Sequence, residues 1–223
     1  CKCAMQLPHL LFVVCCVCPL PFPHSVMAFM NMLDEPLPTM LHWGMWLPTL
    51  QGQATPAQQE EWTPPTMQMQ IVGTYAQTEL GHGSYLRGLE TTATFDSSAD
   101  EWIVHSPTLT STKWWPGGLG KTCTHAIVMA RLFIAGKDFG PHPFIVQLRS
   151  LSDHAPLTGI SVGSIGPKLG WITSDNGYLR FDHVRIPRKN MLMRHAQVSE
   201  EGVYTKPSGS VKTSYGTMVM VRV

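Results

Sequence analysis

Two short segments of this chain, residues 74–84 and residues 113–120, combine hydroxyl groups, glycines and indole rings where β-strands are expected to end. The first segment carries Thr78, and the second carries Trp115 and Gly117. Loops of this composition offer backbone N–H groups, short hydroxyls and flat aromatic walls. A planar ligand with polar edges, such as an isoalloxazine ring, needs these groups from its site. The two segments therefore predict a shared site for a flat cofactor.

Each residue type in these segments also has a simpler explanation. Trp114 and Trp115, considered alone, are typical of core or interface anchors, since burial is the common use of an indole ring. The glycines of both segments would suit ordinary tight turns. His82, which stands between two glycines, is expected to bond to a backbone group and is given no catalytic role. The residue types alone leave both interpretations open.

The composition is that of a globular protein with little net charge. The chain has 223 residues, 43% of them hydrophobic, and can bury a core of ordinary size. It has 16 basic and 15 acidic residues, a formal net charge of +1, and no long basic run. Nucleic acid is therefore not an expected partner. A small anionic partner, such as the phosphates of a cofactor, needs only a few local contacts and is not excluded by the net charge.

The cysteines are concentrated at the N-terminus. Cys123 stands alone in the body of the chain, and the other cysteines fall within the first 18 residues. A structural zinc site needs paired C-x-x-C spacings or suitably spaced histidines, and a secreted disulfide framework spreads its cysteines through the fold. Neither pattern is found. We therefore assign no metal ligand and expect thiols in a reducing compartment.

The N-terminal region also contains an apolar run, residues 10–18, between Pro8 and Pro19. The run is far shorter than the roughly 20 residues of a membrane span, so no membrane span is expected. It lacks a small-residue cleavage site, and the chain does not begin with Met, which argues against a signal peptide. We interpret residues 1–33 as an anomalous Cys- and Pro-rich leader outside the fold, from a truncated or wrongly joined terminus.

Helical signals are confined to the first third of the chain. Residues 37–50 are rich in Met, Trp and Leu and predict a buried helix that is broken near Pro48. Residues 55–58 fit a capping box with proline at the first helical position. They predict a short helix that reaches about Trp62 and is ended by Pro64.

From residue 67 onward, short β-branched or aromatic runs alternate with turn residues. The expected strands are residues 67–76, 91–96, 101–106, 126–133, 144–149 and 177–186. The short connection at residues 97–100 predicts a hairpin over residues 91–106. No dinucleotide-binding glycine fingerprint is found between a strand and a helix. A mostly antiparallel barrel or sandwich is therefore predicted, and a helix could begin at Tyr215.

Four motifs occur in order along the chain. They are TYAQTELGHG at residues 74–83, GLETTAT at residues 88–94, KWWPGGLGK at residues 113–121 and DHVRIPR at residues 182–188. Together they resemble the N-terminal half of a peroxisomal acyl-CoA oxidase, a flavoprotein of the acyl-CoA dehydrogenase superfamily. The resemblance runs from about Glu35 to Val223, whereas residues 1 to about 30 match nothing that we identify in the family.

The resemblance implies an α+β fold whose centre is an antiparallel β-barrel domain. It assigns residues 34–66 to the remnant of an N-terminal helical domain and residues 67–190 to the middle β-barrel domain. Residues 191–223 would form a linker and the start of a truncated C-terminal helical domain, whose bundles are absent from this chain. In the family, FAD lies between the barrel and the bundles and partly against a second subunit, which implies a homodimer.

The resemblance also assigns site residues. The implied FAD-binding residues are Thr78, Gly117, Tyr75, Ala76, Gln77 and Trp115. Thr78 would contact the flavin through its hydroxyl or backbone, and the backbone of Gly117 would face the ring edge near N5. Ser84 corresponds to a substrate-binding position near the thioester end of acyl-CoA. The catalytic base of the family is a glutamate of the C-terminal bundle, so no catalytic residue is assigned here, and neither Glu79 nor Glu90 is promoted to that role.

The chemistry of these residues agrees with the assignment. A flavin that accepts a hydride gains negative charge, which the Thr78 hydroxyl and the Gly117 amide would stabilise as donors. Acyl-CoA dehydrogenases carry a Trp-x-Thr pattern where this chain has Trp-Pro-Gly, ending at Gly117. We hypothesise that the missing side chain leaves room for dioxygen at the reduced flavin.

The implied function of the parent protein is FAD-dependent oxidation of fatty acyl-CoA to trans-2-enoyl-CoA in peroxisomal β-oxidation. Electrons would pass to molecular oxygen and give hydrogen peroxide. One alternative is a truncated chain without enzymatic function, and this chain by itself is expected to be inactive. Another is an acyl-CoA dehydrogenase that uses an electron-transfer flavoprotein. Peroxisomal location rests on the resemblance alone, since the chain shows no Ser-Lys-Leu-type signal.

Overall fold

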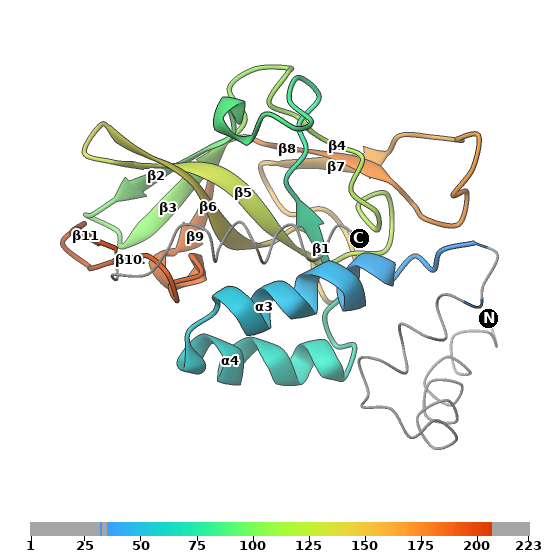
Figure 1. The fold of residues 1–223 in the computed structure, drawn as a ribbon, viewed down its shortest axis with the longest axis horizontal. Coiled ribbons are helices and arrows are strands. Elements are labelled where there is room, and N and C mark those ends of the chain that lie inside the picture. The colour runs from blue at the N-terminus through green and yellow to red at the C-terminus, as the bar shows by residue number, and fades with distance from the viewer. Residues whose placement is uncertain (1–31, 33–34, 207–223) are drawn as a thin grey trace.

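The computed structural model describes residue 32 and residues 35–206, which form an α+β fold (Figure 1). Two helices lie side by side beneath a strongly curled sheet, and a smaller sheet extends from its far end. Apart from residue 32, the predicted leader lies outside the described residues, as does the helix start expected at Tyr215. No helix in the described part of the chain is long and apolar enough to cross a membrane.

The first helical segment is continuous through its proline. A π-helical turn, His42–Trp46, runs directly into α3, Leu47–Gln53. Pro48 lies in the first turn of α3, where its missing N–H removes no bond that the α-helix needs. The predicted break near Pro48 is therefore wrong, because the change from π to α geometry accommodates the ring.

Helix α4, Pro56–Met67, begins at the predicted capping box. The backbone N–H of Gln58 donates to Thr55 Oγ at 3.3 Å, and the N–H of Thr55 donates to Gln58 Oε1 at 3.0 Å. The helix continues through Pro64 and Pro65, past the predicted end near Trp62. These prolines have no N–H to donate to the carbonyls four residues earlier, but their own carbonyls accept from the N–H groups of Gln68 and Gln70, at 3.1 and 3.0 Å, which closes the end of the helix.

The strands are short except for the central pair. They are β1 (Gly73–Ala76), β2 (Thr92–Asp96), β3 (Glu101–His105), β4 (Lys113–Trp114), β5 (His125–Ile134), β6 (Lys137–Gln147), β7 (Ile160–Ser164), β8 (Gly177–Phe181), β9 (Val184–Pro187), β10 (Gln197–Val198) and β11 (Tyr204–Thr205). Two 3-10 turns, η2 (Leu86–Gly88) and η3 (Arg188–Asn190), connect them.

The main sheet is mixed and has the order β1-β5-β2-β3-β9, with β6 paired to β5. Strands β1 and β2 both run parallel to β5, whereas the other pairs of this sheet are antiparallel. Strands β4, β8 and β7 form a second, antiparallel sheet, and β10 pairs with β11. The fold is thus α+β, as predicted, with a curled half-barrel sheet that is not wholly antiparallel.

Strand β5 is buried on both faces over residues 126–130, which explains the unbroken apolar run there. Ala126, Val128 and Leu132 point into the core enclosed by the curled sheet. Ile127 and Met129 point the other way and pack against the tryptophans and leucines of the helices. The two-residue alternation of a strand therefore serves two cores at once.

Several strand predictions are confirmed, and others miss the strand bounds. The predicted hairpin over residues 91–106 is confirmed as β2 and β3. At one end of the ladder Thr92 pairs with His105, and at the other end Asp96 pairs with Glu101. The expected strand at residues 177–186 is divided into β8 and β9 at His183, whose φ is +50°. The prediction missed β7 and the first half of β6, because glycine or proline interrupts both.

Candidate functional site

A pocket of about 210 Å³ lies where the end of β1, the loop after β4 and the loop before β8 meet the first helical segment. Its lining is mostly apolar and aromatic, with a few hydroxyl and amide groups. The lining residues are Met40, Leu41, Met45, Tyr75, Gln77, Thr78, Trp115, Pro116, Gly117, Trp171, Ser174 and Asn176. None of these described residues is acidic, basic or histidine, and the hydroxyl of Tyr75 donates to Gln77 Oε1 at 3.2 Å, so the pocket suits binding.

The ends of β1 and β4 are joined by hydrogen bonds at the pocket. The backbone N–H of Trp114 donates to the carbonyl of Thr78 at 2.9 Å. The hydroxyl of Thr74 donates to the carbonyl of Gly117 at 2.6 Å. The two segments that the sequence associated with one site therefore lie side by side.

The loop after β4 carries an unusual backbone conformation. Trp115 has φ +89°, which is uncommon for a residue with a side chain. Its N–H donates to the carbonyl of Gly177 at 3.0 Å, and its own carbonyl accepts from Asn176 Nδ2 at 2.5 Å. The N–H of Gly177 donates in turn to the carbonyl of Pro116 at 3.0 Å. These bonds hold Trp115 in a strained turn that leaves half of its side chain exposed at the pocket.

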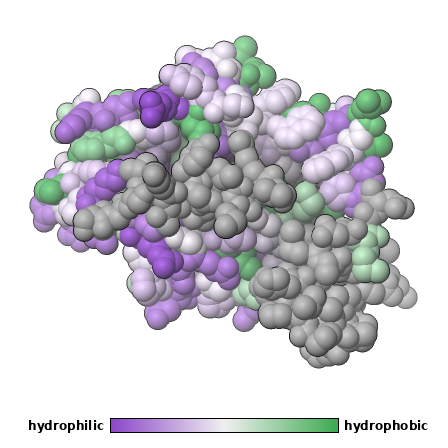
Figure 2. Space-filling view, in the orientation of Figure 1, coloured by the Kyte–Doolittle hydropathy of each residue, from purple (hydrophilic) through white to green (hydrophobic). Residues whose placement is uncertain are grey.

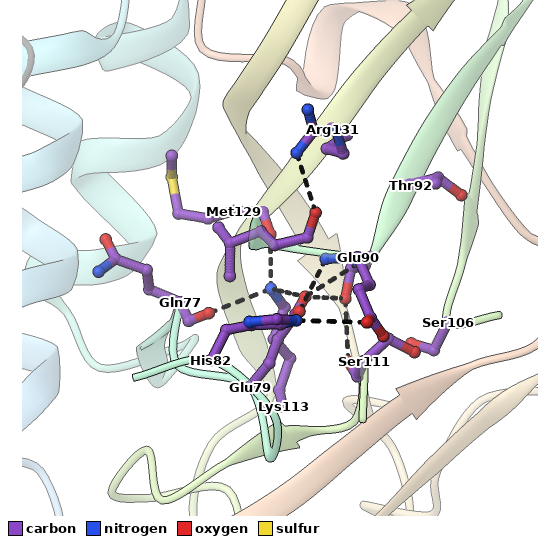
Figure 3. Close-up of polar contacts among 12 residues, drawn as sticks. Gln77, Glu79, His82, Glu90, Thr92, Ser106, Ser111, Lys113, Met129 and Arg131 are labelled. Carbon is purple, nitrogen blue, oxygen red and sulfur yellow. Dashed lines mark hydrogen bonds and ion pairs between the residues drawn. The ribbon is translucent and has the colours of Figure 1, made fainter. Parts of the chain in front are cut away.

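A buried ion pair stands directly behind these loops (Figure 3). Lys113 Nζ lies 3.0 Å from Glu79 Oε1, and both side chains are fully excluded from solvent. The carboxylate also accepts from the N–H groups of Glu90 and Thr91, at 2.8 and 2.9 Å, and from the Thr91 hydroxyl at 2.6 Å. Each charge is therefore well provided with partners, the condition under which a buried pair is tolerated.

Lys113 also fills a gap in the main sheet. Strands β1 and β2 pair with the two halves of the same edge of β5, at residues 125–128 and 131–133, and leave residues 129–130 uncovered between them. Lys113 Nζ donates to the carbonyl of Met129 at 2.6 Å and to that of Gln77 at 3.2 Å. Figure 3 shows the ammonium group reaching between these two carbonyls and Glu79. The side chain thus completes the edge of β5 where the chain leaves the sheet to form the pocket wall.

Burial lowers the pKa of Lys113 to about 8, and the charge and hydrogen bond of Glu79 oppose the shift. The hydrogen bonds of Lys113 fix the backbone at Gln77, and the pair lies directly beside Thr78 and Trp114, on both sides of the pocket.

Two donors at the pocket are free to bind a ligand. Among the described residues, none accepts a hydrogen bond from the hydroxyl of Thr78 or from the backbone N–H of Gly117. A Cβ at Gly117 would lie 2.8 Å from Ser174 Oγ and 3.5 Å from Leu41 Cδ1, so even a methyl group would narrow the space here. A donor pair beside a bare backbone thus lies at the pocket, and its contact with a flavin stays a prediction.

The structure brings five of the six predicted FAD-binding residues to this pocket, namely Tyr75, Gln77, Thr78, Trp115 and Gly117. Ala76 does not line it, because alternation along β1 turns its side chain into the opposite core. Ser84 is exposed on the loop before η2 and does not line the pocket either. Any part that Ala76 plays through its backbone, or Ser84 through its hydroxyl, stays a prediction.

The glutamates and His82 of the matched motifs lie away from the pocket. Glu79 is held in the buried pair, and Glu90 accepts from Thr110 Oγ at 2.7 Å on the surface. His82 Nε2 lies 3.2 Å from Glu90 Oε1, so its partner is a carboxylate and not the expected backbone group. Hydrogen bonds from Thr108 and Thr110 hold the pKa of Glu90 below its ordinary value.

Half of the pocket was not predicted from the sequence. Trp171, Ser174 and Asn176 come from the loop between β7 and β8, and Met40, Leu41 and Met45 come from the first helical segment. The loop also exposes Leu169 and Ile172, and Figure 2 shows hydrophobic surface at this edge of the molecule. The available signal was a tryptophan, Trp171, in a loop rich in turn residues. Nothing in the sequence indicated that this loop lies beside Trp115.

Comparison with known proteins shows which family this chain resembles. A family model described as acyl-coenzyme A oxidase N-terminal matches residues 23–72, so the similarity begins earlier than the predicted leader boundary. Peroxisomal acyl-coenzyme A oxidase 1 of Mus musculus is 54% identical over 202 residues, which is 90% of this chain and 30% of the relative. The chain is a homologue of the acyl-CoA oxidases.

Solved acyl-CoA oxidases share the fold. Acyl-CoA oxidase 1 of Arabidopsis thaliana matches with a TM-score of 0.90 and 50% identity, over 99% of this chain and 33% of that protein. Acyl-CoA oxidase-2 of Caenorhabditis elegans, solved with FAD, ascaroside-CoA and ATP, matches with a TM-score of 0.80 and 50% identity, over 83% of this chain and 28% of that protein. This chain thus spans about a third of the length of the oxidases that it matches.

Proposed function

We propose that this chain forms one wall of the flavin site in an FAD-dependent, peroxisomal fatty acyl-CoA oxidase. The observation that carries the proposal is the meeting of Thr78, Trp115 and Gly117 in one pocket, together with 54% identity to an acyl-CoA oxidase. The oxidase would convert acyl-CoA to trans-2-enoyl-CoA. Two electrons and two protons would reduce O2 to hydrogen peroxide.

The residues of the pocket fit a flavin ring. The Thr78 hydroxyl and the Gly117 amide would donate to its polar edge, and Tyr75 and Trp115 would contact its faces. When bound, FAD would take the hydride from the acyl chain. The contribution of this chain is to orient the ring, to supply donors and to exclude water. The proton would be removed by a group outside the pocket lining seen here.

The domain assignment belongs to the same proposal. We propose that residues 67–190 form the middle β-barrel domain, with residues 34–66 as part of an N-terminal helical domain and residues 191–223 as a linker to a C-terminal helical domain. The family model of the N-terminal region begins at residue 23, so the leader would be limited to residues 1–22. A homodimer would place a second subunit against the FAD site. The curled sheet supports this assignment, because the pocket lies at the end of the sheet that contains β1.

Stopped-flow kinetics would test the proposal on a complete oxidase that includes this sequence. We expect a fatty acyl-CoA to bleach the flavin without oxygen, and O2 to restore it with one hydrogen peroxide per turnover. Rapid reoxidation by an electron-transfer flavoprotein but slow reoxidation by O2 would favour the dehydrogenase alternative. Failure of acyl-CoA to bleach bound flavin would overturn the proposal. The 223-residue chain alone should show no turnover.

A further inference from the structure

A cluster of two histidines and an aspartate lies at the opposite end of β8 from the pocket. The ligand atoms of His105, Asp182 and His183 all fall within 4.8 Å of one another. Asp182 Oδ1 lies 2.8 Å from His183 Nδ1 and 3.9 Å from His105 Nδ1. We propose that this cluster is a surface site for a divalent transition-metal ion of the Zn²⁺ class.

The topology of the sheet brings the two imidazoles together. In the antiparallel ladder of β3 and β9, Val104 pairs with Val184, so the next positions along the ladder are His105 and His183. Their rings stack with centroids 3.9 Å apart and planes 22° from parallel. Side chains at opposed positions of an antiparallel ladder lie close enough to share a ligand, and one of the stacked rings would turn so that both in-plane lone pairs meet the ion.

The ligand groups are held by a fixed backbone. The N–H of Asp182 donates to the carbonyl of Gly159 at 2.8 Å, and the N–H of Ser106 donates to the carbonyl of Phe181 at 2.9 Å. The left-handed φ of +50° at His183 turns the chain sharply between β8 and β9. This turn brings consecutive residues, an aspartate and a histidine, to the same point as His105.

The chemistry of the cluster is that of a metal site with open positions. Neutral imidazole and carboxylate are ligands for Zn²⁺, and four-coordinate geometry with bonds of roughly 2.0–2.2 Å separates ligand atoms by roughly 3.3 Å. The observed separations are 3.9 Å for His105 and 2.8 Å for His183, and the second is a hydrogen bond between His183 Nδ1 and Asp182 Oδ1 that a metal ion would replace. Three protein ligands with Asp182 and His183 exposed would leave a fourth position for water.

His105 supplies an unused ligand atom. Its Nδ1 is buried and has no hydrogen-bond partner among the described residues. Among the described residues, the Asp182 carboxylate has ion-pair contacts only with the imidazoles of His105 and His183. A buried polar atom without a partner is uncommon in folded proteins, and a metal ion between the three groups would satisfy it.

The test is isothermal titration of the full chain with Zn²⁺ in a buffer that does not chelate. The N-terminal thiols would also bind zinc, so every protein in the experiment carries serine at Cys1, Cys3, Cys15, Cys16 and Cys18. We expect one site that is weakened at least about tenfold by each of His105→Asn, Asp182→Asn and His183→Asn. Asparagine tolerates a positive φ, which makes it a suitable replacement at residue 183.

His82→Asn is the matched control, because His82 and Glu90 form another surface pair of imidazole and carboxylate. Its zinc affinity should equal that of the parent protein. Zinc should also raise the midpoint of thermal unfolding of the parent and of His82→Asn, but not of Asp182→Asn. Equal zinc affinity in all variants, or no saturable binding by a folded parent, would overturn the proposal. The proposal does not depend on the flavin site, which lies beyond the other end of β8.

Discussion

Lys113 and Glu79 form an ion pair of 3.0 Å that is completely buried, and the two residues lie 34 positions apart in the sequence. Glu79 directly follows Thr78, and Lys113 is two residues before Trp115. The pair therefore ties together the two loops that carry the proposed flavin contacts. It also replaces backbone pairing along the edge of β5, where Lys113 donates to Met129.

Removing the lysine should destabilise the fold strongly. Lys113→Met leaves a buried carboxylate without its counter-charge, and we expect the free energy of unfolding of the full chain to fall by about 3–5 kcal/mol. Urea unfolding of Lys113→Met, Glu79→Gln and the double variant would measure it. The double variant should lose less than the sum of the single variants, because it leaves no unpaired charge.

The exposed pair of Lys189 and Glu61, at 2.9 Å, provides the control. Lys189→Met should change the free energy of unfolding by no more than about 1 kcal/mol, as is usual for exposed ion pairs. A similarly small effect for Lys113→Met would contradict the role that we give to the buried pair.

Acid should weaken the fold through His42. Its Nδ1 accepts from the N–H of Gly73 at 2.9 Å, so its Nε2 carries the proton and donates to the carbonyl of Thr66 at 3.2 Å. Burial lowers the pKa of His42 from 6.5 to about 4. Between these two values the unfolded chain binds more protons than the folded chain, so stability is lost as the pH falls through this window.

His42→Gln keeps one donor and one acceptor at this position without a group that titrates near neutrality. We expect the variant to lose less stability than the parent between neutral pH and about pH 5, as measured by urea unfolding at each pH. His125, whose pKa burial also lowers to about 4, would still give part of the acid effect. Equal losses in variant and parent would show that His42 does not titrate as its burial requires.

Arg149 should stabilise the loop that follows Gly117. Its guanidinium donates to the carbonyls of Cys123 at 2.7 Å, Leu119 at 2.8 Å and Gly120 at 3.1 Å. Arg149→Leu would leave these carbonyls without that donor, so we expect a loss of about 2–4 kcal/mol in the free energy of unfolding. Arg180→Leu, at an exposed position of β8, should change it by less than about 0.5 kcal/mol. Similar losses in the two variants would contradict this role.

The bare backbone at Gly117 should control access of oxygen. In a complete oxidase, Gly117→Thr should slow reoxidation of the flavin by O2 more than it slows reduction by acyl-CoA. The new side chain would meet Ser174 Oγ, so a second variant that adds Ser174→Ala separates crowding of the protein from exclusion of oxygen. Gly83→Thr, where a Cβ would meet no atom within 4 Å, is the control. Equal slowing of both half-reactions would contradict the hypothesis.

The sequence was most informative where local chemistry decides the structure. Thr55 and Gln58 identified the start of α4, because a capping box depends only on neighbouring residues. The connection at residues 97–100 likewise identified the β2–β3 hairpin. The bounds of β6 were missed because Pro141 and Pro143 lie inside the strand, where local rules disfavour proline. The path through Pro48 was missed because the π-helical turn before it was not predicted.

The sequence could not predict contacts between distant segments. The parallel pairing of β1 and β2 with β5, and the gap that Lys113 fills between them, depend on the whole sheet. The sequence did not predict a metal site at His105 and His183 either. Only the register of β3 against β9 brings these two residues together. The motif resemblance supplied the Thr78 and Gly117 side of the pocket but not the Trp171 side.

The central claim is that this pocket holds a flavin through the Thr78 hydroxyl and the Gly117 amide. Titration of FAD into the apo form of a complete oxidase, followed by flavin fluorescence, tests it most directly. We expect Thr78→Val to weaken FAD binding about five- to tenfold, the loss of roughly one hydrogen bond. The control, Thr92→Val on β2, should bind FAD as the parent does. Equal FAD affinities for Thr78→Val and the parent protein would contradict the claim.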